Sequence, residues 1–262
     1  MKRWILWSCA LLIAAGVGPL EARPLRFAGD GTFRIAQFTD MHLDPGTPER
    51  LAEAEKSFAR IDRIVRTERP DLLLFTGDVV TGQPAAGMWR RLLDTLSRRG
   101  VPFCIVLGNH DAEQDLSRRE IARMVASAPG SLNTLDATGE LADVELTLGG
   151  SAPERVAAAL YCLDSHDYST VEGVEGYGWF DRRQIDWLRD CCDRRTRENG
   201  GGAASVAGLF PHCTARICRG VAEYRQPPHR AGCRGGVPRG VELRNVRRHG
   251  RDAQHHGHLR GP

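Results

Sequence analysis

The chain has 262 residues, of which 41% are hydrophobic and 26% are charged. This length allows a full buried core, in one large domain or in two small ones. The formal net charge of +3 gives no reason to expect a nucleic acid or another polyanion as the main partner. The composition therefore predicts a globular protein.

The first 22 residues have the pattern of a secretory signal peptide. Lys2 and Arg3 precede an almost uninterrupted apolar run at residues 4–17, which ends among small residues. The run is short for a membrane-spanning helix, and glycines stand near its end. The alternative is that the segment is an uncleaved membrane anchor. We therefore expect residues 1–22 to be removed, no membrane span to remain, and the mature chain to be secreted, periplasmic or otherwise extracytoplasmic.

The pattern up to residue 107 predicts strands that alternate with helices. The expected strands are residues 33–38, 72–75 and 101–107, and the expected helices are residues 48–68 and 89–99. Apolar side chains recur at helical spacing in both helices, which end at Pro70 and Gly100. A β-α-β-α-β order predicts a parallel sheet that is covered on both faces.

The pattern changes after this parallel unit. A helix is predicted at residues 117–126, where Ser117 and Glu120 have the spacing of a capping box. Strands are expected at residues 141–148, 157–163 and 203–210, and a helix at residues 179–195. We expect a second sheet with antiparallel parts and one domain that spans residues 23–210.

Eight cysteines in an exported chain could form disulfides, but their positions argue against a disulfide framework. Cys104 and Cys162 lie inside apolar strand patterns, where cysteine acts as a small hydrophobic residue. Cys191 and Cys192 are adjacent and cannot easily pair with each other. We therefore predict no disulfide framework.

Polar residues follow each of the three expected parallel strands. These residues are Asp40 and His42 after the first strand, Asp78 after the second, and Asn109, His110 and Asp111 after the third. Open α/β sheets bind their ligands at the carboxyl ends of the strands. We therefore expect the polar side chains to converge on a metal centre.

The types of these side chains favour a pair of metal ions. Asp40 and His42 point to the same side of an extended segment, and carboxylate oxygen with imidazole nitrogen suits Zn, Fe or Mn rather than Ca. The carboxylate of Asp78 can bridge two ions, and Asn109 can give a neutral oxygen to the second. Two such ions clamp a phosphoryl group and lower the pKa of a bound water.

His110 is expected to lie beside the metals rather than on them. It could donate a proton or a hydrogen bond to the phosphoryl or leaving-group oxygen, with Asp111 orienting its ring. Taken singly, Asp78 could be a turn residue and His42 a surface histidine. Their order at three successive strand ends favours the site.

At this point the sequence resembles the calcineurin-like metallophosphoesterases, the superfamily that includes the purple acid phosphatases. The likeness runs over residues 33–210. It includes residues 161–165 and 177–180 with Gln184 and Trp187, which are similar to the exported, purple-acid-phosphatase-like branch. The resemblance implies a four-layer α/β/β/α sandwich. It also implies a small phosphate mono- or diester as substrate, hydrolysed by metal-activated hydroxide at a dinuclear Fe, Mn or Zn site.

The resemblance also implies a role for each matching residue. Asp40 and His42 would bind the first metal, and Asp78 would bridge the two. Asn109 would bind the second metal, and His110 would be the catalytic histidine. The family has three further metal-binding histidines downstream, and these do not appear in their family setting in this sequence.

Residues 211–262 have a different composition, rich in Arg, Gly, Pro, His and Cys and with almost no apolar periodicity. One interpretation is a basic, disordered tail that binds nucleic acid or metal. We favour a shifted reading frame, because reading one nucleotide later permits Phe-His-Ile-Ala-Leu-Pro-Glu-Tyr near residue 210 and Gly-Thr-Phe-Val-Gly-His at the end. Both peptide sequences resemble the histidine motifs of the family that are not seen in the frame as written.

This interpretation has a functional consequence. The chain as written would lack the distal histidines, so we expect its phosphoesterase activity to be impaired and its C-terminal part to be incomplete and disordered. The alternative function is that of a non-catalytic exported protein that retains the phosphoesterase scaffold. A nucleic acid binder that uses the arginine-rich tail is not expected.

Overall fold

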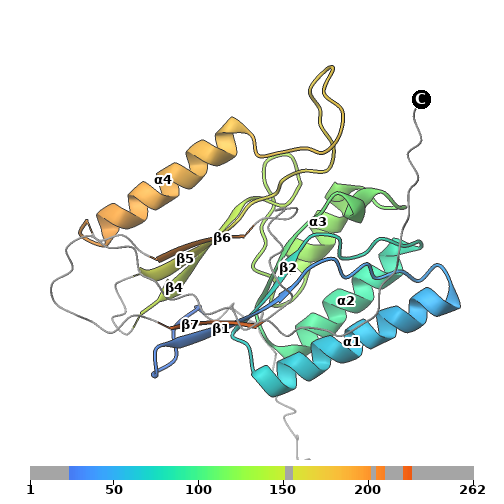
Figure 1. Cartoon of the computed structure of the whole chain (residues 1–262), viewed down its shortest axis with the longest axis horizontal. Helices are drawn as coiled ribbons and strands as arrows, with labels where there is room; N and C mark the ends of the chain where they lie inside the picture. The colour runs from blue at the N-terminus through green and yellow to red at the C-terminus, as the bar shows by residue number, and fades with distance from the viewer. Residues whose placement is uncertain (1–23, 151–155, 202–204, 210–220, 226–262) are drawn as a thin grey trace, which may run out of the picture.

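A computed structural model describes residues 24–150, 156–201, 205–209 and 221–225 (Figure 1). In chain order the elements are β1 (Thr32–Phe38), α1 (Pro48–Glu68), β2 (Leu72–Thr76), α2 (Ala85–Arg99), β3 (Phe103–Val106), the short 3-10 turn η1 (His110–Ala112), α3 (Arg118–Ser127), β4 (Val144–Gly149), β5 (Val156–Cys162), α4 (Arg182–Glu198), β6 (Ser205–Leu209) and β7 (Val221–Arg225). The predicted signal peptide lies outside the described residues. Within them, no helix combines the length and apolar character needed to cross a membrane.

The strands form two sheets. The first has the order β3-β2-β1-β7, in which β1, β2 and β3 are parallel and β7 is antiparallel to β1. The second has the order β4-β5-β6, in which β4 and β5 are antiparallel and β5 and β6 are parallel. The expected parallel unit and the expected second sheet with antiparallel parts are therefore both confirmed.

Strand β2 shows why the chain folds into layers. Its side chains alternate between two faces, and Leu73 and Phe75 belong to the core under α1, α2 and α3. Leu72 and Leu74 belong to a second core between the two sheets. A strand covered on both faces needs the continuous apolar run that the sequence has here.

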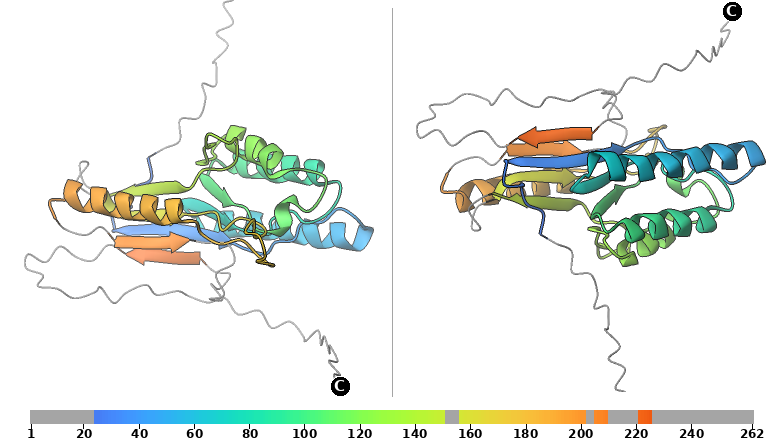
Figure 2. Two further views of the ribbon diagram at one scale, coloured as in Figure 1. Left: turned by 90° about the horizontal axis from the view of Figure 1, so that it is seen from above. Right: turned by 90° about the horizontal axis from the view of Figure 1, so that it is seen from below.

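A third core completes the architecture. Tyr161 of β5 and Cys191 of α4 pack between the second sheet and that helix, and the rings of Tyr161 and Trp187 meet edge to face, with centroids 6.0 Å apart. Figures 1 and 2 show α4 on one side of the paired sheets and α1, α2 and α3 on the other. The predicted four-layer α/β/β/α class is confirmed.

Helix boundaries follow the local sequence where a side chain of the same segment sets them. Helix α1 begins at Pro48 behind the N-cap Thr47, as its sequence predicts. Helix α2 begins at Ala85, earlier than the predicted residue 89. The Ala85 amide donates to the Asp115 carboxylate at 2.8 Å, so a distant residue stabilises this end.

One part of the predicted tail belongs to the fold. Strand β7 lies within residues 211–262, and its backbone pairs with β1, with Ile35 opposite Ala222. The rest of that tail lies outside the described residues. The cysteines in the described ranges, Cys104, Cys162, Cys191 and Cys192, are free thiols.

Candidate metal centre

The loops after β1 and β2 are held together by backbone hydrogen bonds. The Asp40 amide donates to the Gly77 carbonyl at 3.2 Å, and the His42 amide donates to the Asp78 carbonyl at 3.0 Å. The Leu43 amide donates to the backbone carbonyl of the residue after Asp78, at 2.9 Å. The pairing of the parallel sheet thus continues past the strand ends, and it places Asp40, His42 and Asp78 side by side.

These three residues share an unusual backbone conformation. The φ angles of Asp40, His42 and Asp78 are +50°, +45° and +53°. Left-handed backbone is uncommon for residues with a Cβ, and it costs about 1–3 kcal/mol where it is strained. Such conformations persist where the surrounding structure enforces them, and they cluster at functional sites.

The side chains of these residues form a compact cluster. One ligand atom from each of Asp40, His42 and Asp78 lies within 4.8 Å of the others. Asp78 is buried, whereas Asp40 and His42 are exposed. Two carboxylates and one imidazole are a donor set that suits Zn, Fe or Mn. The residues present therefore fit a metal ion that enters from solvent.

Neighbouring hydroxyls hold two of the candidate ligands. The Thr39 hydroxyl lies 2.8 Å from Asp40 Oδ2, and Nδ1 of His42 lies 3.3 Å from Thr81 Oγ1. Because Nδ1 faces Thr81, Nε2 is the ring nitrogen of His42 that remains for a metal. Outer partners of this kind fix the orientation and the tautomer of metal-binding side chains.

The loop after β3 completes the site. The His110 amide donates to Asp78 Oδ1 at 3.2 Å, and the ring centroids of His42 and His110 are 6.2 Å apart. Asn109 is buried at the same strand end. Gly108 permits this approach, because a Cβ at that position would lie 2.2 Å from Asp78 Oδ1.

Asp111 has a different place from the one predicted. Its carboxylate is fully buried, and it accepts hydrogen bonds from the amides of Val79, Val80 and Gly108 at 2.7, 2.9 and 2.8 Å. Burial raises the pKa of Asp111 to about 6, against the effect of these three amides. Asp111 thus ties the second and third loops together, and the prediction that it orients the His110 ring has to be corrected.

The carboxylate at the His110 ring is that of Glu113. Nδ1 of His110 lies 2.5 Å from Glu113 Oε2. This hydrogen bond raises the pKa of His110 above its ordinary value, while partial burial acts the other way. Sequence reasoning missed Glu113, although its spacing of three residues from His110, in a strand-end turn, was visible.

A model of the family of calcineurin-like phosphoesterases matches residues 33–226 of the chain. This protein belongs to that family. The match confirms the resemblance found in the sequence, and it runs past the predicted boundary at residue 210 to include β7.

Each match between this calcineurin-like phosphoesterase and a curated relative covers only part of the relative's length. The "probable inactive purple acid phosphatase 28" of Arabidopsis thaliana is 32% identical over 197 residues, which are 64% of this chain and 50% of the relative. The phosphatase DCR2 of Saccharomyces cerevisiae is 29% identical over 201 residues, which are 68% of this chain and 35% of the relative. A crystal structure of a dimetal phosphatase from Danio rerio has a TM-score of 0.47 at 16% identity and covers 69% of each chain. This chain spans half or less of these two curated relatives.

In this calcineurin-like phosphoesterase a buried ion pair joins the site to the second sheet. The Arg118 guanidinium pairs with the Asp164 carboxylate, and the two side chains are only 10% and 12% exposed. Arg118 also donates to the Gly108 carbonyl at 3.1 Å. The strand end of β5 is thus fixed against the loop that carries Asn109 and His110.

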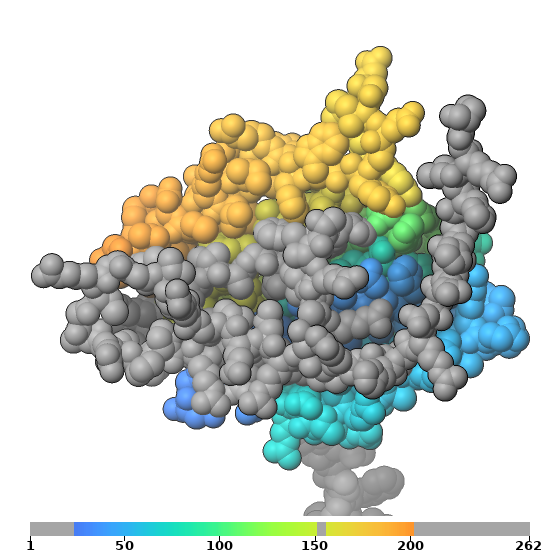
Figure 3. Space-filling model, in the orientation of Figure 1, coloured from blue at the N-terminus to red at the C-terminus, as the bar shows by residue number. Residues whose placement is uncertain are grey.

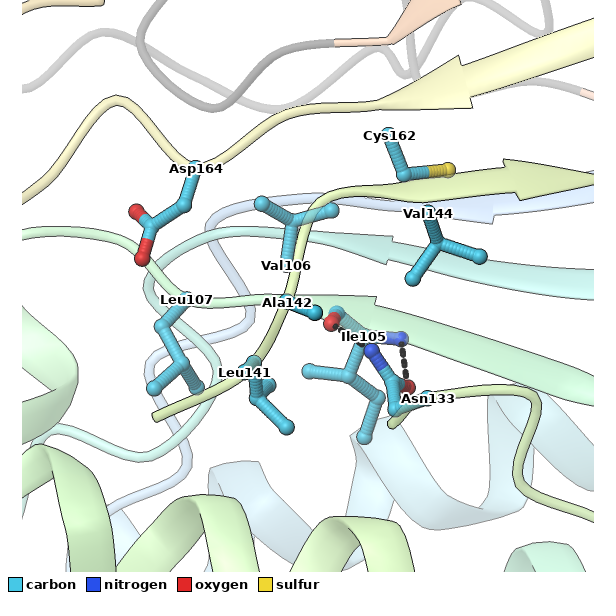
Figure 4. Close-up of a pocket in the computed structure, with 9 residues that line it drawn as sticks. All are labelled: Ile105, Val106, Leu107, Asn133, Leu141, Ala142, Val144, Cys162 and Asp164. Carbon is cyan, nitrogen blue, oxygen red and sulfur yellow. Dashed lines mark hydrogen bonds between the residues drawn. The ribbon is translucent and has the colours of Figure 1, made fainter. Parts of the chain in front are cut away.

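A small, mainly apolar pocket lies behind this ion pair. Figure 4 shows Asp164 at one end of its lining and Cys162 and Val144 at the other. The Asn133 side chain makes two hydrogen bonds of 2.8 Å to the backbone of Ile105, in the manner of a neighbouring strand. None of the six predicted site residues lines the pocket, and we assign it no part in the chemistry.

Proposed function

We propose that this chain is a metal-dependent phosphoesterase that acts on small phosphate mono- or diesters. The observation that carries the proposal is the convergence of Asp40, His42 and Asp78 on left-handed backbone at adjoining strand ends. Membership of the calcineurin-like phosphoesterase family supports it. The UDP-2,3-diacylglucosamine pyrophosphatase LpxG of Chlamydia muridarum, 31% identical over 117 residues, is a relative whose name describes cleavage at a phosphoryl group.

Each predicted ligand has a part in this proposal. Asp40 and His42 would hold a first ion, Asp78 would reach both ions, and Asn109 would hold a second. Ions of Fe, Mn or Zn at such a site supply positive charge for the phosphoryl oxygens and lower the pKa of bound water. His110, beside the cluster, would give a proton or a hydrogen bond to the phosphoryl or leaving-group oxygen.

We further propose that this activity is impaired in the chain as written. The downstream histidines that the family resemblance implies do not appear in their family setting in this sequence, and they would complete the metal coordination. A second candidate is a non-catalytic exported protein that keeps the scaffold, and the words "probable inactive" in the name of the Arabidopsis relative favour it. The apolar N-terminal segment supports export in either case.

Hydrolysis of 4-nitrophenyl phosphate by the purified chain, with and without added Mn²⁺, Fe²⁺ or Zn²⁺, separates the candidates. We expect slow, metal-dependent turnover that Asp78→Asn abolishes, and faster turnover from a chain translated in the corrected frame. Metal binding without turnover in both frames would favour the scaffold. Turnover that survives Asp78→Asn would contradict the proposed site.

A further inference from the structure

We propose that Glu113, itself held by Tyr168, is the positioning residue for His110. The inference rests on the proposed function, because it gives the His110 ring a task at the site. Nδ1 of His110 donates to Glu113 Oε2 at 2.5 Å, and the Tyr168 hydroxyl donates to Glu113 Oε1. Both carboxylate oxygens are therefore engaged, one by the histidine and one by the tyrosine.

The tyrosine comes from a hairpin that joins β5 to α4. The Ser169 amide donates to the Gly176 carbonyl at 2.9 Å, and the Tyr168 and Tyr177 rings stack with their centroids 5.8 Å apart. Figure 3 shows this part of the chain, in yellow, projecting beyond the body of the molecule. The hairpin thus provides a partner for a carboxylate that lies far from it in the sequence.

The His110–Glu113 pair orients the His110 ring and adds little to the stability of the fold. The two side chains are 38% and 30% exposed, and pairs this exposed contribute little to folding. The pair does fix which ring nitrogen is available. With Nδ1–H committed to Glu113, Nε2 is the atom that can pass its proton to a leaving-group oxygen, and water then replaces that proton.

Asp111, the partner predicted from the sequence, is fully buried and accepts from three backbone amides, whereas Nδ1 of the His110 ring lies against Glu113. Tyr168 therefore contacts the group that orients the candidate acid. We infer that the hairpin sets the geometry of this side of the site.

Nitrogen-15 NMR of the imidazole groups tests the positioning without requiring turnover. In the full chain we expect a downfield Nδ1–H resonance, assigned by its loss in His110→Asn. It should disappear or move upfield in Glu113→Gln, shift less in Tyr168→Phe, and stay in place in the matched control Glu172→Gln on the exposed hairpin tip. An unchanged resonance in Glu113→Gln would overturn the proposal.

Kinetics on esters with different leaving groups give a second test. A poor leaving group needs the proton more than a good one does, so Glu113→Gln should lower kcat on phenyl phosphate by about 10-fold or more. It should lower kcat on 4-nitrophenyl phosphate much less and leave KM unchanged on both esters. An equal loss on both esters would contradict positioning. If the unaltered, metal-loaded chain hydrolyses neither ester, the proposed function fails, and the NMR result alone decides the positioning.

Discussion

Gly108 shows at the scale of one residue how the site constrains the sequence. A Cβ there would lie 2.2 Å from Asp78 Oδ1 and 2.5 Å from the Asp78 amide nitrogen. Neither neighbour can withdraw, because Asp78 is buried and its backbone carries the cluster. Glycine is therefore required for the β2 and β3 loops to meet.

We expect Gly108→Ala to destabilise the fold by about 1–3 kcal/mol through this overlap and to weaken metal binding. The matched control is Gly87→Ala in α2, where a new Cβ meets no atom within 4 Å apart from the adjoining backbone of its own helix. That change should raise stability, by up to about 1 kcal/mol, since alanine is the better helix former. Urea denaturation of both variants measures the difference, and equal stabilities would contradict the proposed overlap.

Residue-scale prediction from the sequence succeeded where polar residues follow strands directly. Asp40, His42 and Asp78 could be placed together because parallel strands bring their carboxyl ends to one edge. The distinction between Asp111 and Glu113 could not be predicted. It depends on the path of a 3-10 turn that directs Asp111 into the protein and His110 outward, toward Glu113.

Helix α4 shows at the scale of one element how the outer layer is held. Glu145 of β4 is nearly buried, and its carboxylate accepts from Arg194 at 2.6 Å and from Arg195 at 2.8 Å. Burial alone would raise the pKa of Glu145, but the two arginines keep it below the ordinary value of 4.5. The ionised form is therefore stabilised in the folded protein.

We expect Glu145→Gln to lower the free energy of unfolding by about 1–2 kcal/mol at pH 7. A carboxylate with a lowered pKa gives stability above its ordinary pKa and loses it as the pH falls below about 4.5. The difference between the variant and the unaltered chain should therefore shrink between pH 5 and pH 3. Denaturant titrations at several pH values check this, and a constant difference would argue against the ion pairs.

The matched control for Glu145→Gln is Glu55→Gln. Glu55 pairs with Arg91 in the same way, but its side chain is 53% exposed. An exposed pair contributes about 0–1 kcal/mol, so this variant should change stability much less. A loss equal to that of Glu145→Gln would show that burial does not decide the effect.

Element prediction from the sequence was most accurate where a strand is buried on both faces or a helix carries its own cap. Strand β2 and helix α1 satisfy these conditions and lie where they were expected. The start of α2 depends on Asp115, which is 30 residues from Ala85 and has no local signature.

At the scale of the whole molecule, the Arg118–Asp164 pair joins the two halves of the sandwich beside the site. Arg118 begins α3, which packs on the first sheet, and Asp164 follows β5 of the second sheet. Both side chains are nearly buried, so an unpaired partner would keep a poorly solvated charge. The same ion pair therefore holds the loop of the site in place and connects the two sheets.

We expect Arg118→Met to destabilise the protein by about 3 kcal/mol, because it leaves Asp164 uncompensated. The double variant Arg118→Met with Asp164→Leu should recover much of that loss. Arg182→Met removes an exposed pair with Asp186 and is the control, with an expected change of about 1 kcal/mol or less. Additive effects of the two changes at the buried pair would contradict the coupling.

The layer architecture could be inferred from the sequence because the alternation of elements and the family resemblance agree. The strand at residues 221–225 could not be inferred in this way, because the sequence around it lacks apolar periodicity. The backbone of β7 nevertheless pairs with β1. Edge pairing needs only backbone donors and acceptors, which every residue except proline can offer.

The most direct test of the metal centre is the metal content of the purified chain after equilibration with Mn²⁺, Fe²⁺ or Zn²⁺. We predict that the chain retains a first ion through Asp40, His42 and Asp78, and that a second position loads incompletely without the distal histidines. Asp78→Asn should lose the metal, whereas Asp71→Asn, remote from the cluster, should keep it. Equal metal content in these two variants, or none in the unaltered chain, would contradict the assignment of the site.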